Sequence, residues 1–247
     1  MTTLDGKLAL VTGAAGVLGF AIARALAAQG LRMILADVNG DAVETRAAAI
    51  GPLATPCTLD VGNADAVARA CALLRERHGS VDVLVNNAGI LSNDKAVETT
   101  PQAWRRLLAV NLDGAFYLAR ECLPGMRASG WGRIVNICSL AMKTGGITAG
   151  TAYTTSKGGL AALTFSLARE TTRDGITVNG IAPAYINTPM VTEQLTEAQR
   201  RKLLAEIPVG RFCEADEVAH VVAFLVSPMS GFITGEIIDI NGGLHLD

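Results

Sequence analysis

Short apolar runs alternate with longer helical patterns along almost the whole of this 247-residue sequence. The apolar runs have the length of buried strands, and we expect strands at residues 7–12, 32–37, 55–60, 81–86, 133–138, 177–181 and 236–240. Helical patterns separate them, at residues 20–29, 41–50, 64–77, 101–126, 152–173 and 215–226, with further helical segments in 188–206. Strands joined through helices form right-handed crossovers. The pattern therefore predicts an α/β fold with a doubly wound parallel sheet, in one domain over residues 1–247.

The composition excludes several classes of protein. Half of the residues are hydrophobic, 18% are charged, and 21 basic against 23 acidic side chains leave a net charge of −2. Such a balance argues against a nucleic-acid-binding surface, which usually carries a basic excess. No apolar stretch reaches about 18 residues without a charge or a breaker, so we expect no membrane span. The five cysteines form no CxxC pair, which indicates a reduced, cytoplasmic protein without a metal site.

A glycine-rich turn follows the first predicted strand, and a helical pattern follows the turn. Gly13, Gly16 and Gly19 punctuate this turn, with Val17 and Leu18 between the last two. Glycines let the backbone approach a diphosphate, and the dipole of the following helix favours its negative charge. The position of the turn, in the first strand–helix unit, predicts the diphosphate site of a dinucleotide cofactor.

Polar residues stand where the next strands end. Asp37 closes the second predicted strand, where a carboxylate accepts hydrogen bonds from the adenosine ribose of NAD. It would repel the additional phosphate of NADP, and no Lys or Arg stands beside it in the sequence, so we expect NAD as the cofactor. Asp60 closes the third strand and is a candidate adenine contact. Asn87, Ala88 and Gly89 follow the fourth strand, and open α/β sheets bind ligands at these carboxyl ends.

Three residues with catalytic potential come from two elements. Tyr153 and Lys157 are four residues apart at the start of a long helical pattern, so they share one face of the helix. Ser139 stands at the carboxyl end of the fifth predicted strand. A strand end and a helix start can meet in one crevice. A free tyrosine has a pKa of about 10, and a nearby cation such as Lys157 favours its phenolate form.

Together these features resemble the short-chain dehydrogenase/reductase family, in its common branch of chains of this length. The resemblance covers residues 4–243 and rests on the glycine turn, residues 86–89, Asn111, Ser139, the run from Tyr153 to Lys157, and residues 183–188. It implies a Rossmann-like fold and an NAD(P)-dependent alcohol–carbonyl oxidoreductase. It also implies a homotetramer.

The resemblance implies a role for each residue of the site. Tyr153 takes the proton of the alcohol while a hydride passes to the nicotinamide, Ser139 holds the substrate oxygen, and Lys157 binds the nicotinamide ribose. Asn111 supports a water-mediated proton relay, and Thr188 matches the contact to the nicotinamide carboxamide. The further cofactor contacts that it implies are Val38, Val61, Tyr153, Lys157, Pro183 and Ile186.

Two positions and one spacing depart from the family pattern. Val17 stands where the family places the middle glycine of the turn, and Ala184 replaces the glycine that follows Pro183. The spacing between Ser139 and Tyr153 is one residue longer than usual. A β-branched side chain disfavours positive φ. We therefore expect Val17 to crowd the cofactor, unless the turn has shifted so that Gly16 provides the close approach.

The leading hypothesis is an NAD-dependent oxidoreductase that interconverts a secondary alcohol and its ketone. The alternatives are a 3-oxoacyl-carrier reductase, whose usual NADPH is disfavoured by Asp37, and a non-catalytic NAD-binding regulatory protein. We expect the substrate pocket to be built from residues 91–95, 140–150 and 185–204, with a substrate loop at about 185–210. Its apolar and polar candidate residues are Leu140, Met142, Tyr185, Met190, Val191 and Leu195, and Asn93, Asp94 and Lys143.

Overall fold

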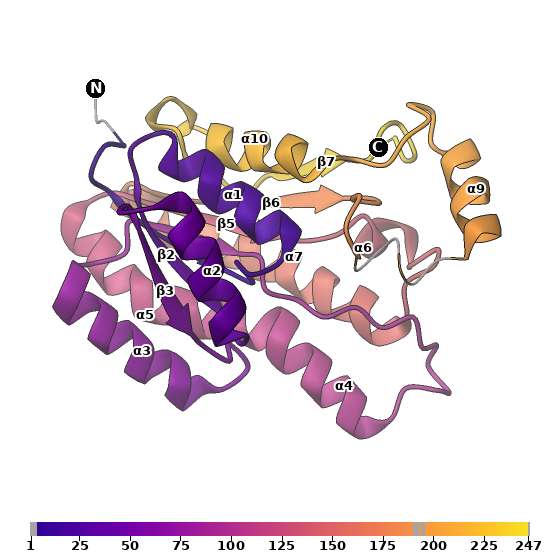
Figure 1. The fold of residues 1–247 in the computed structure, drawn as a ribbon, viewed down its shortest axis with the longest axis horizontal. Coiled ribbons are helices and arrows are strands. Elements are labelled where there is room, and N and C mark those ends of the chain that lie inside the picture. The colour runs from indigo at the N-terminus through magenta and orange to yellow at the C-terminus, as the bar shows by residue number, and fades with distance from the viewer. Residues whose placement is uncertain (1–3, 190–192, 194–195, 247) are drawn as a thin grey trace.

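The computed structural model of the chain describes residues 4–189, 193 and 196–246 (Figure 1). The described residues form one parallel seven-stranded sheet with the order β3-β2-β1-β4-β5-β6-β7. The strands are β1 (Leu8–Thr12), β2 (Arg32–Asp37), β3 (Ala54–Thr58), β4 (Val83–Asn86), β5 (Gly132–Ile137), β6 (Ile176–Pro183) and β7 (Ile237–Ile240). This arrangement confirms the predicted doubly wound parallel sheet.

Helices cover both faces of the sheet (Figure 1). One face packs against α1 (Val17–Ala27), α2 (Gly40–Ile50) and α10 (Ala215–Val226), and the other against α3 (Ala64–His78), α5 (Gly114–Ser129) and α7 (Thr151–Thr171). The shorter elements are α4 (Pro101–Leu108), a π-helical turn (Ala109–Asp113), α6 (Ala141–Thr144), 3-10 turns (Thr172–Asp174 and Pro228–Ser230) and α9 (Glu197–Glu206).

Successive residues of β1 point to opposite faces of the sheet, and both faces are buried. Ala9 and Val11 belong to the core formed with α1, α2 and α10, whereas Leu8 and Leu10 belong to the core formed with α3, α5 and α7. None of the four exposes more than 1% of its surface. A parallel sheet that is covered on both sides requires continuously apolar strands, which is why the short apolar runs predict the strands.

The first helix begins earlier than the sequence pattern predicts. The pattern places its start at residue 20, but α1 begins at Val17, and the Phe20 N–H donates to the carbonyl oxygen of Gly16 at 3.0 Å. Val17, Leu18 and Gly19 are therefore helical residues rather than part of the turn. Gly16 caps the helix without a side-chain hydrogen bond, so the Ser, Thr, Asp or Asn signal of a helix start is absent.

Two further boundaries differ from the prediction. The helix predicted at residues 101–126 is divided by the π-helical turn, which carries Asn111 in its middle, and α5 continues past Pro124 to Ser129. A single π-turn inside a helical stretch interrupts the α-helical period for only one turn, so the sequence pattern does not reveal it. The third strand ends at Thr58, so Asp60 lies in the loop that follows.

Strands β1 and β4 are neighbours, and the strand order runs away from them in opposite directions. Such a switch point leaves a crevice at the carboxyl ends of the strands. Thr12, at the end of β1, is tied to the segment after β4. Asn87 Nδ2 donates to the Thr12 carbonyl oxygen at 2.8 Å, and Thr12 Oγ1 accepts from the N–H groups of Asn87 and Ala88 at 3.0 Å each.

We predict that Gly19→Ala destabilises the protein. An added Cβ would overlap the carbonyl oxygen of Gly13 and would lie 2.8 Å from Asn87 Nδ2. Overpacking of this kind typically costs about 1–3 kcal/mol, so thermal denaturation should show a lower melting temperature. Gly16→Ala is the matched control, because its Cβ would meet the same carbonyl oxygen at 3.3 Å. Equal losses of stability in the two variants would contradict the close contact at Gly19.

Candidate active site

Ser139, Tyr153 and Lys157 meet beyond the carboxyl end of β5. Ser139 lies two residues after this strand, and Tyr153 and Lys157 lie about one turn apart on α7. All three residues line one cavity of about 530 Å³. The structure therefore brings together the three residues whose cooperation the sequence predicts.

Lys157 is the buried cation of this site, with 4% of its surface exposed. Its Nζ donates to the carbonyl oxygen of Ile137, the last residue of β5, at 2.7 Å and lies 5.8 Å from the centre of the Tyr153 ring. Burial lowers the pKa of Lys157 to about 8, because the charged amine loses hydration. The ammonium form remains the major form at neutral pH.

Burial raises the pKa of Tyr153, whereas the positive charge of Lys157 is expected to lower it. Loss of hydration raises the pKa of the Tyr153 phenol, and hydrogen bonding with Ser139 offsets this rise only in part. Tyr153 is therefore a neutral phenol at neutral pH, which is the form that can donate a proton to a carbonyl oxygen. Proton removal from an alcohol needs the phenolate, and this form requires further positive charge near the ring.

Asn111 is buried in the π-helical turn and binds the segment that follows β4. Its Oδ1 accepts from the Ile90 N–H at 2.8 Å, and its Nδ2 donates to the Ile90 carbonyl oxygen at 3.0 Å and to Ser156 Oγ at 3.1 Å. Gly89 lies between Asn111 and Lys157, since a Cβ there would be 3.4 Å from Asn111 Oδ1 and 3.5 Å from Lys157 Nζ. Asn111 thus lies beside the site, and its role in a proton relay stays a prediction.

The 530 Å³ cavity extends from the glycine turn to α7. Besides Tyr153 and Lys157, the predicted cofactor contacts that line it are Gly13, Gly16, Val17, Leu18, Gly19, Asp37, Asn87, Gly89, Pro183, Ile186 and Thr188. It is also lined by Ala184, which departs from the family pattern, and by residues that the sequence pattern does not single out: Ala15, Arg46, Ile137, Cys138 and Pro189. The first residues of α1 border the cavity, which places a helix N-terminus where a diphosphate is expected.

Four predicted cofactor contacts do not line this cavity in the described part of the chain: Val38, Asp60, Val61 and Ala88. Asp60 instead pairs with Arg106 at 3.0 Å and accepts from the Gly62 N–H at 3.0 Å. The Ala88 N–H is bound to Thr12. The loop after β3 turns Asp60 toward α4, and its adenine contact stays a prediction.

Asp37 is held in place at the end of β2. Its Oδ2 accepts from the Ala15 N–H and its Oδ1 from the Asn39 N–H, each at 3.0 Å. Arg46 of α2 lines the same cavity, donates from Nε to the Ala15 carbonyl oxygen at 3.3 Å and lies over the Phe20 ring. The expectation that no base stands beside Asp37 holds along the sequence but not in space, because α2 brings Arg46 back to the same loop.

Val17 lines the cofactor cavity with 39% of its surface exposed. Every described residue with positive φ is a glycine, so the backbone of Val17 does not carry the strain that a β-branched residue would suffer there. Val17 opens a helix, so the positive φ that a β-branched residue disfavours is not required of it. Crowding of the cofactor by its side chain stays a prediction.

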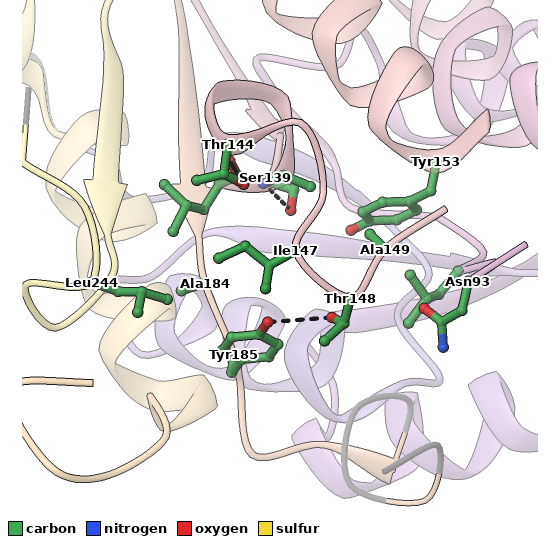
Figure 2. Close-up of a pocket in the computed structure, with 13 residues that line it drawn as sticks. Asn93, Ser139, Thr144, Ile147, Thr148, Ala149, Tyr153, Ala184, Tyr185 and Leu244 are labelled. Atoms are coloured by element: carbon green, nitrogen blue, oxygen red, sulfur yellow. Dashed lines mark hydrogen bonds between the residues drawn. The ribbon is translucent and has the colours of Figure 1, made fainter. Parts of the chain in front are cut away.

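A smaller pocket of about 90 Å³ adjoins the cofactor cavity (Figure 2). Ser139, Tyr153 and Ala184 line both spaces. The other residues around the small pocket are Leu91, Asn93, Leu140, Ala141, Thr144, Ile147, Thr148, Ala149, Tyr185 and Leu244. The small pocket is a candidate substrate site, because it shares Ser139 and the proton-donating phenol with the cofactor cavity.

The predicted wall segments supply most of this pocket. Three of the named candidates line it: Asn93, Leu140 and Tyr185. Three described candidates do not: Met142, Asp94 and Lys143. Lys143 pairs instead with Asp239 of β7 at 2.8 Å. The remaining candidates lie outside the described residues: Met190, Val191 and Leu195.

Leu244 is a wall residue that sequence reasoning misses. It lies more than 50 positions beyond the other residues of the pocket, after the last strand. No periodicity or motif marks it, because its position depends on how the segment after β7 folds back.

Among the described residues, no cluster of three His, Cys, Asp or Glu suits a metal ion, and no helix is long and apolar enough to cross a bilayer.

A family model described as enoyl-(acyl carrier protein) reductase matches residues 13–245. The chain belongs to the short-chain dehydrogenase/reductase family. This short-chain dehydrogenase/reductase is 36% identical to the 3-oxoacyl-(acyl-carrier-protein) reductase of Vibrio cholerae over 244 residues, covering 98% of this chain and 99% of the relative. Its identity to the Pseudomonas aeruginosa enzyme of the same name is 38% over 248 residues, covering 99% of each chain.

Two solved structures from Brucella melitensis share the fold of this short-chain dehydrogenase/reductase. One is described as a glucose/ribitol dehydrogenase and matches with a TM-score of 0.91 and 33% identity over 100% of both chains. The other is a 3-ketoacyl-(acyl-carrier-protein) reductase in complex with NADH, with a TM-score of 0.91 and 30% identity over 98% of this chain and 99% of that one. The protein is therefore an oxidoreductase that acts on a CH–OH group or the matching carbonyl.

The groups around the large cavity fit a nicotinamide dinucleotide. The N-terminus of α1 suits a diphosphate, the fixed Asp37 carboxylate suits ribose hydroxyls, and Lys157 and Tyr153 line the same space. When bound, such a cofactor supplies or accepts a hydride. The chain's own task is then to hold the substrate oxygen and to move one proton.

We predict that Tyr153→Phe lowers kcat/KM by about 10²–10⁴-fold, because the variant keeps the ring but loses the proton donor. Nucleotide binding and the melting temperature should change little. Tyr117→Phe is the matched control, since Tyr117 packs beside the core formed with α3, α5 and α7. Steady-state kinetics within about threefold of wild type in Tyr153→Phe would rule out the proton-transfer role.

Proposed function

We propose that this protein interconverts a 3-oxoacyl thioester and its 3-hydroxyacyl form with NAD(H). The observation that carries the proposal is the similarity to 3-oxoacyl-(acyl-carrier-protein) reductases at 36–38% identity over nearly the whole chain. The site supports it, because Ser139 and Tyr153 lie between a cofactor cavity and a substrate pocket. A secondary alcohol and its ketone are the reacting groups of this chemistry, in agreement with the reaction type that the sequence indicates.

The walls of the substrate pocket favour a short acyl group. Leucine, isoleucine and alanine side chains make up most of them, and the pocket measures only about 90 Å³. The reacting carbonyl would lie against Ser139 and Tyr153, and a short apolar chain would extend toward Ile147. A long chain would need more space than the described residues leave.

The proposed proton chemistry follows from the side chains of the site. Ser139 orients the carbonyl oxygen by a hydrogen bond, and the neutral Tyr153 phenol gives this oxygen its proton during reduction. Lys157, held by the Ile137 carbonyl, provides positive charge that stabilises the resulting phenolate. In the oxidation direction the same phenolate takes the proton back.

NAD(H) is the proposed cofactor because the Asp37 carboxylate is fixed by two backbone N–H groups within the cavity. A carboxylate suits the free hydroxyls of the NAD ribose and repels the additional phosphate of NADP. The 3-ketoacyl-(acyl-carrier-protein) reductase of Brucella melitensis, similar to this chain over its whole length, is in complex with NADH. An acyl group on a carrier is thus compatible with NAD-type recognition.

A polyol is the second candidate substrate. Thr148 Oγ1 and Tyr185 OH lie 3.3 Å apart in the pocket wall, and Asn93 contributes a further polar side chain (Figure 2). Such groups can bind hydroxyls, and the similar structure described as a glucose/ribitol dehydrogenase favours the same reading. The largely apolar remainder of the pocket makes it the less favoured candidate.

A substrate panel tests the proposed function. The purified protein is given NAD⁺ with 3-hydroxybutyryl-N-acetylcysteamine, ribitol or glucose, and acetoacetyl-N-acetylcysteamine with NADH or NADPH. We expect the thioester to exceed both sugars in kcat/KM by at least about tenfold, and NADH to exceed NADPH, because of the apolar pocket and Asp37. Faster oxidation of a sugar would favour the second candidate instead. Equal use of both reduced nucleotides would contradict the role of Asp37.

We further predict that Asp37→Ser alone gives substantial NADP⁺ binding, because Arg46 already lines the cavity and can pair with a phosphate. Calorimetric titration should show the affinity for NADP⁺ rising by about tenfold or more. Adding Arg46→Gln should cancel most of this gain while leaving the affinity for NAD⁺ nearly unchanged. An equal gain with and without Arg46 would show that this arginine does not reach the phosphate.

Assembly as a homotetramer stays a proposal, and exposed aromatic side chains support it. Phe116 of α5 and Phe165 of α7 expose 45% and 51% of their surface, and Phe232, next to β7, is fully exposed. Exposed apolar patches of this kind commonly mark interfaces.

A further inference from the structure

A second cavity of about 120 Å³ lies behind the substrate pocket. Ala184 and Tyr185 line both spaces. The other residues around the second cavity are Ile207, Val209, Arg211, Cys213, Glu217, Ile240, Asn241 and Gly242. The two cavities are therefore neighbours, and the side chain that they share is that of Tyr185, since Ala184 contributes only a methyl group.

The Tyr185 ring is fixed from two sides. Its hydroxyl lies 3.3 Å from Thr148 Oγ1, across the substrate pocket (Figure 2). Its ring packs against Phe212, with ring centres 5.9 Å apart, and against the small core that Leu203 and Ile207 form. A side chain held both by a hydrogen bond and by aromatic packing does not swing aside at low cost. Tyr185 thus closes the end of the substrate pocket as a wall.

The far cavity continues the apolar character of the substrate pocket. Ile207, Val209 and Ile240 provide aliphatic surface, while Arg211 and Glu217 pair with each other at 2.6 Å and leave no net charge at its edge. This space would accept the methylenes of an extended chain if the ring were removed.

We propose that Tyr185 determines the length of the acyl chain that the enzyme accepts, by separating the substrate pocket from this second cavity. The inference rests on the proposed 3-oxoacyl function. It gives Tyr185 a role in specificity rather than in proton transfer, because Ser139 and Tyr153 supply that chemistry. The bulk of the ring excludes the longer chains, so a smaller side chain at this position joins the two spaces.

A homologous series of 3-oxoacyl-N-acetylcysteamine thioesters with four to ten acyl carbons tests this role. In wild type we expect kcat/KM to fall beyond the shortest members. In Tyr185→Ala each additional buried methylene should raise kcat/KM roughly fourfold, so the ratio of the eight-carbon to the four-carbon substrate should rise by at least about tenfold. Tyr185→Phe should keep the wild-type ratio, whatever its overall rate, because the ring remains.

The outcomes separate the two proposals. A wild type that is inactive at every length rejects the 3-oxoacyl function, and the length role with it. An active wild type whose length profile is unchanged in Tyr185→Ala rejects the length role alone. Tyr185→Leu covers the case in which the alanine variant does not fold, since leucine preserves apolar packing with Phe212. A profile in Tyr185→Leu that shifts toward longer chains supports the wall, and an unchanged profile overturns it.

Discussion

The rest of the site depends on the hydrogen bonds that join the ends of β1 and β4. Parallel strands leave their last backbone groups unpaired where the strand order reverses. Thr12 and Asn87 satisfy some of these groups with one another and keep the two strand ends together. The glycine turn, the Asp37 carboxylate and the start of α1 are all arranged around this point. The cofactor cavity is consequently a property of the sheet topology before it is a property of any single side chain.

Desolvation is the second constraint, and it determines the proton chemistry. Burial lowers the pKa of Lys157 to about 8. Its ammonium group donates to the carbonyl oxygen of Ile137, the last residue of β5. The same loss of hydration raises the pKa of Tyr153. Without further positive charge near the ring, Tyr153 is a neutral phenol, and taking a proton from an alcohol requires such charge.

The sequence predicts the parts of this protein that depend on local pattern. Apolar runs identify the strands because both faces of the sheet are covered, and the strand ends then locate Asp37, Ser139 and Asn87. It does not predict Arg46 or Leu244, since both reach their cavities only through the packing of separate elements. It does not predict the pairing of Asp60 with Arg106 either, because the loop after β3 and α4 come together only in the folded chain.

The π-helical turn between α4 and α5 has a consequence for insertions and deletions. A π-turn accommodates one residue more than the α-helical turn that it replaces. Removing one residue between Leu108 and Asn111 would let an ordinary α-helix form and would remove the bulge in which Asn111 lies. Asn111 would then leave Ile90, and the segment after β4 would lose its anchor to α7. Chain length at this point is therefore fixed by the active site, although no residue of the turn lines the cofactor cavity in the described structure.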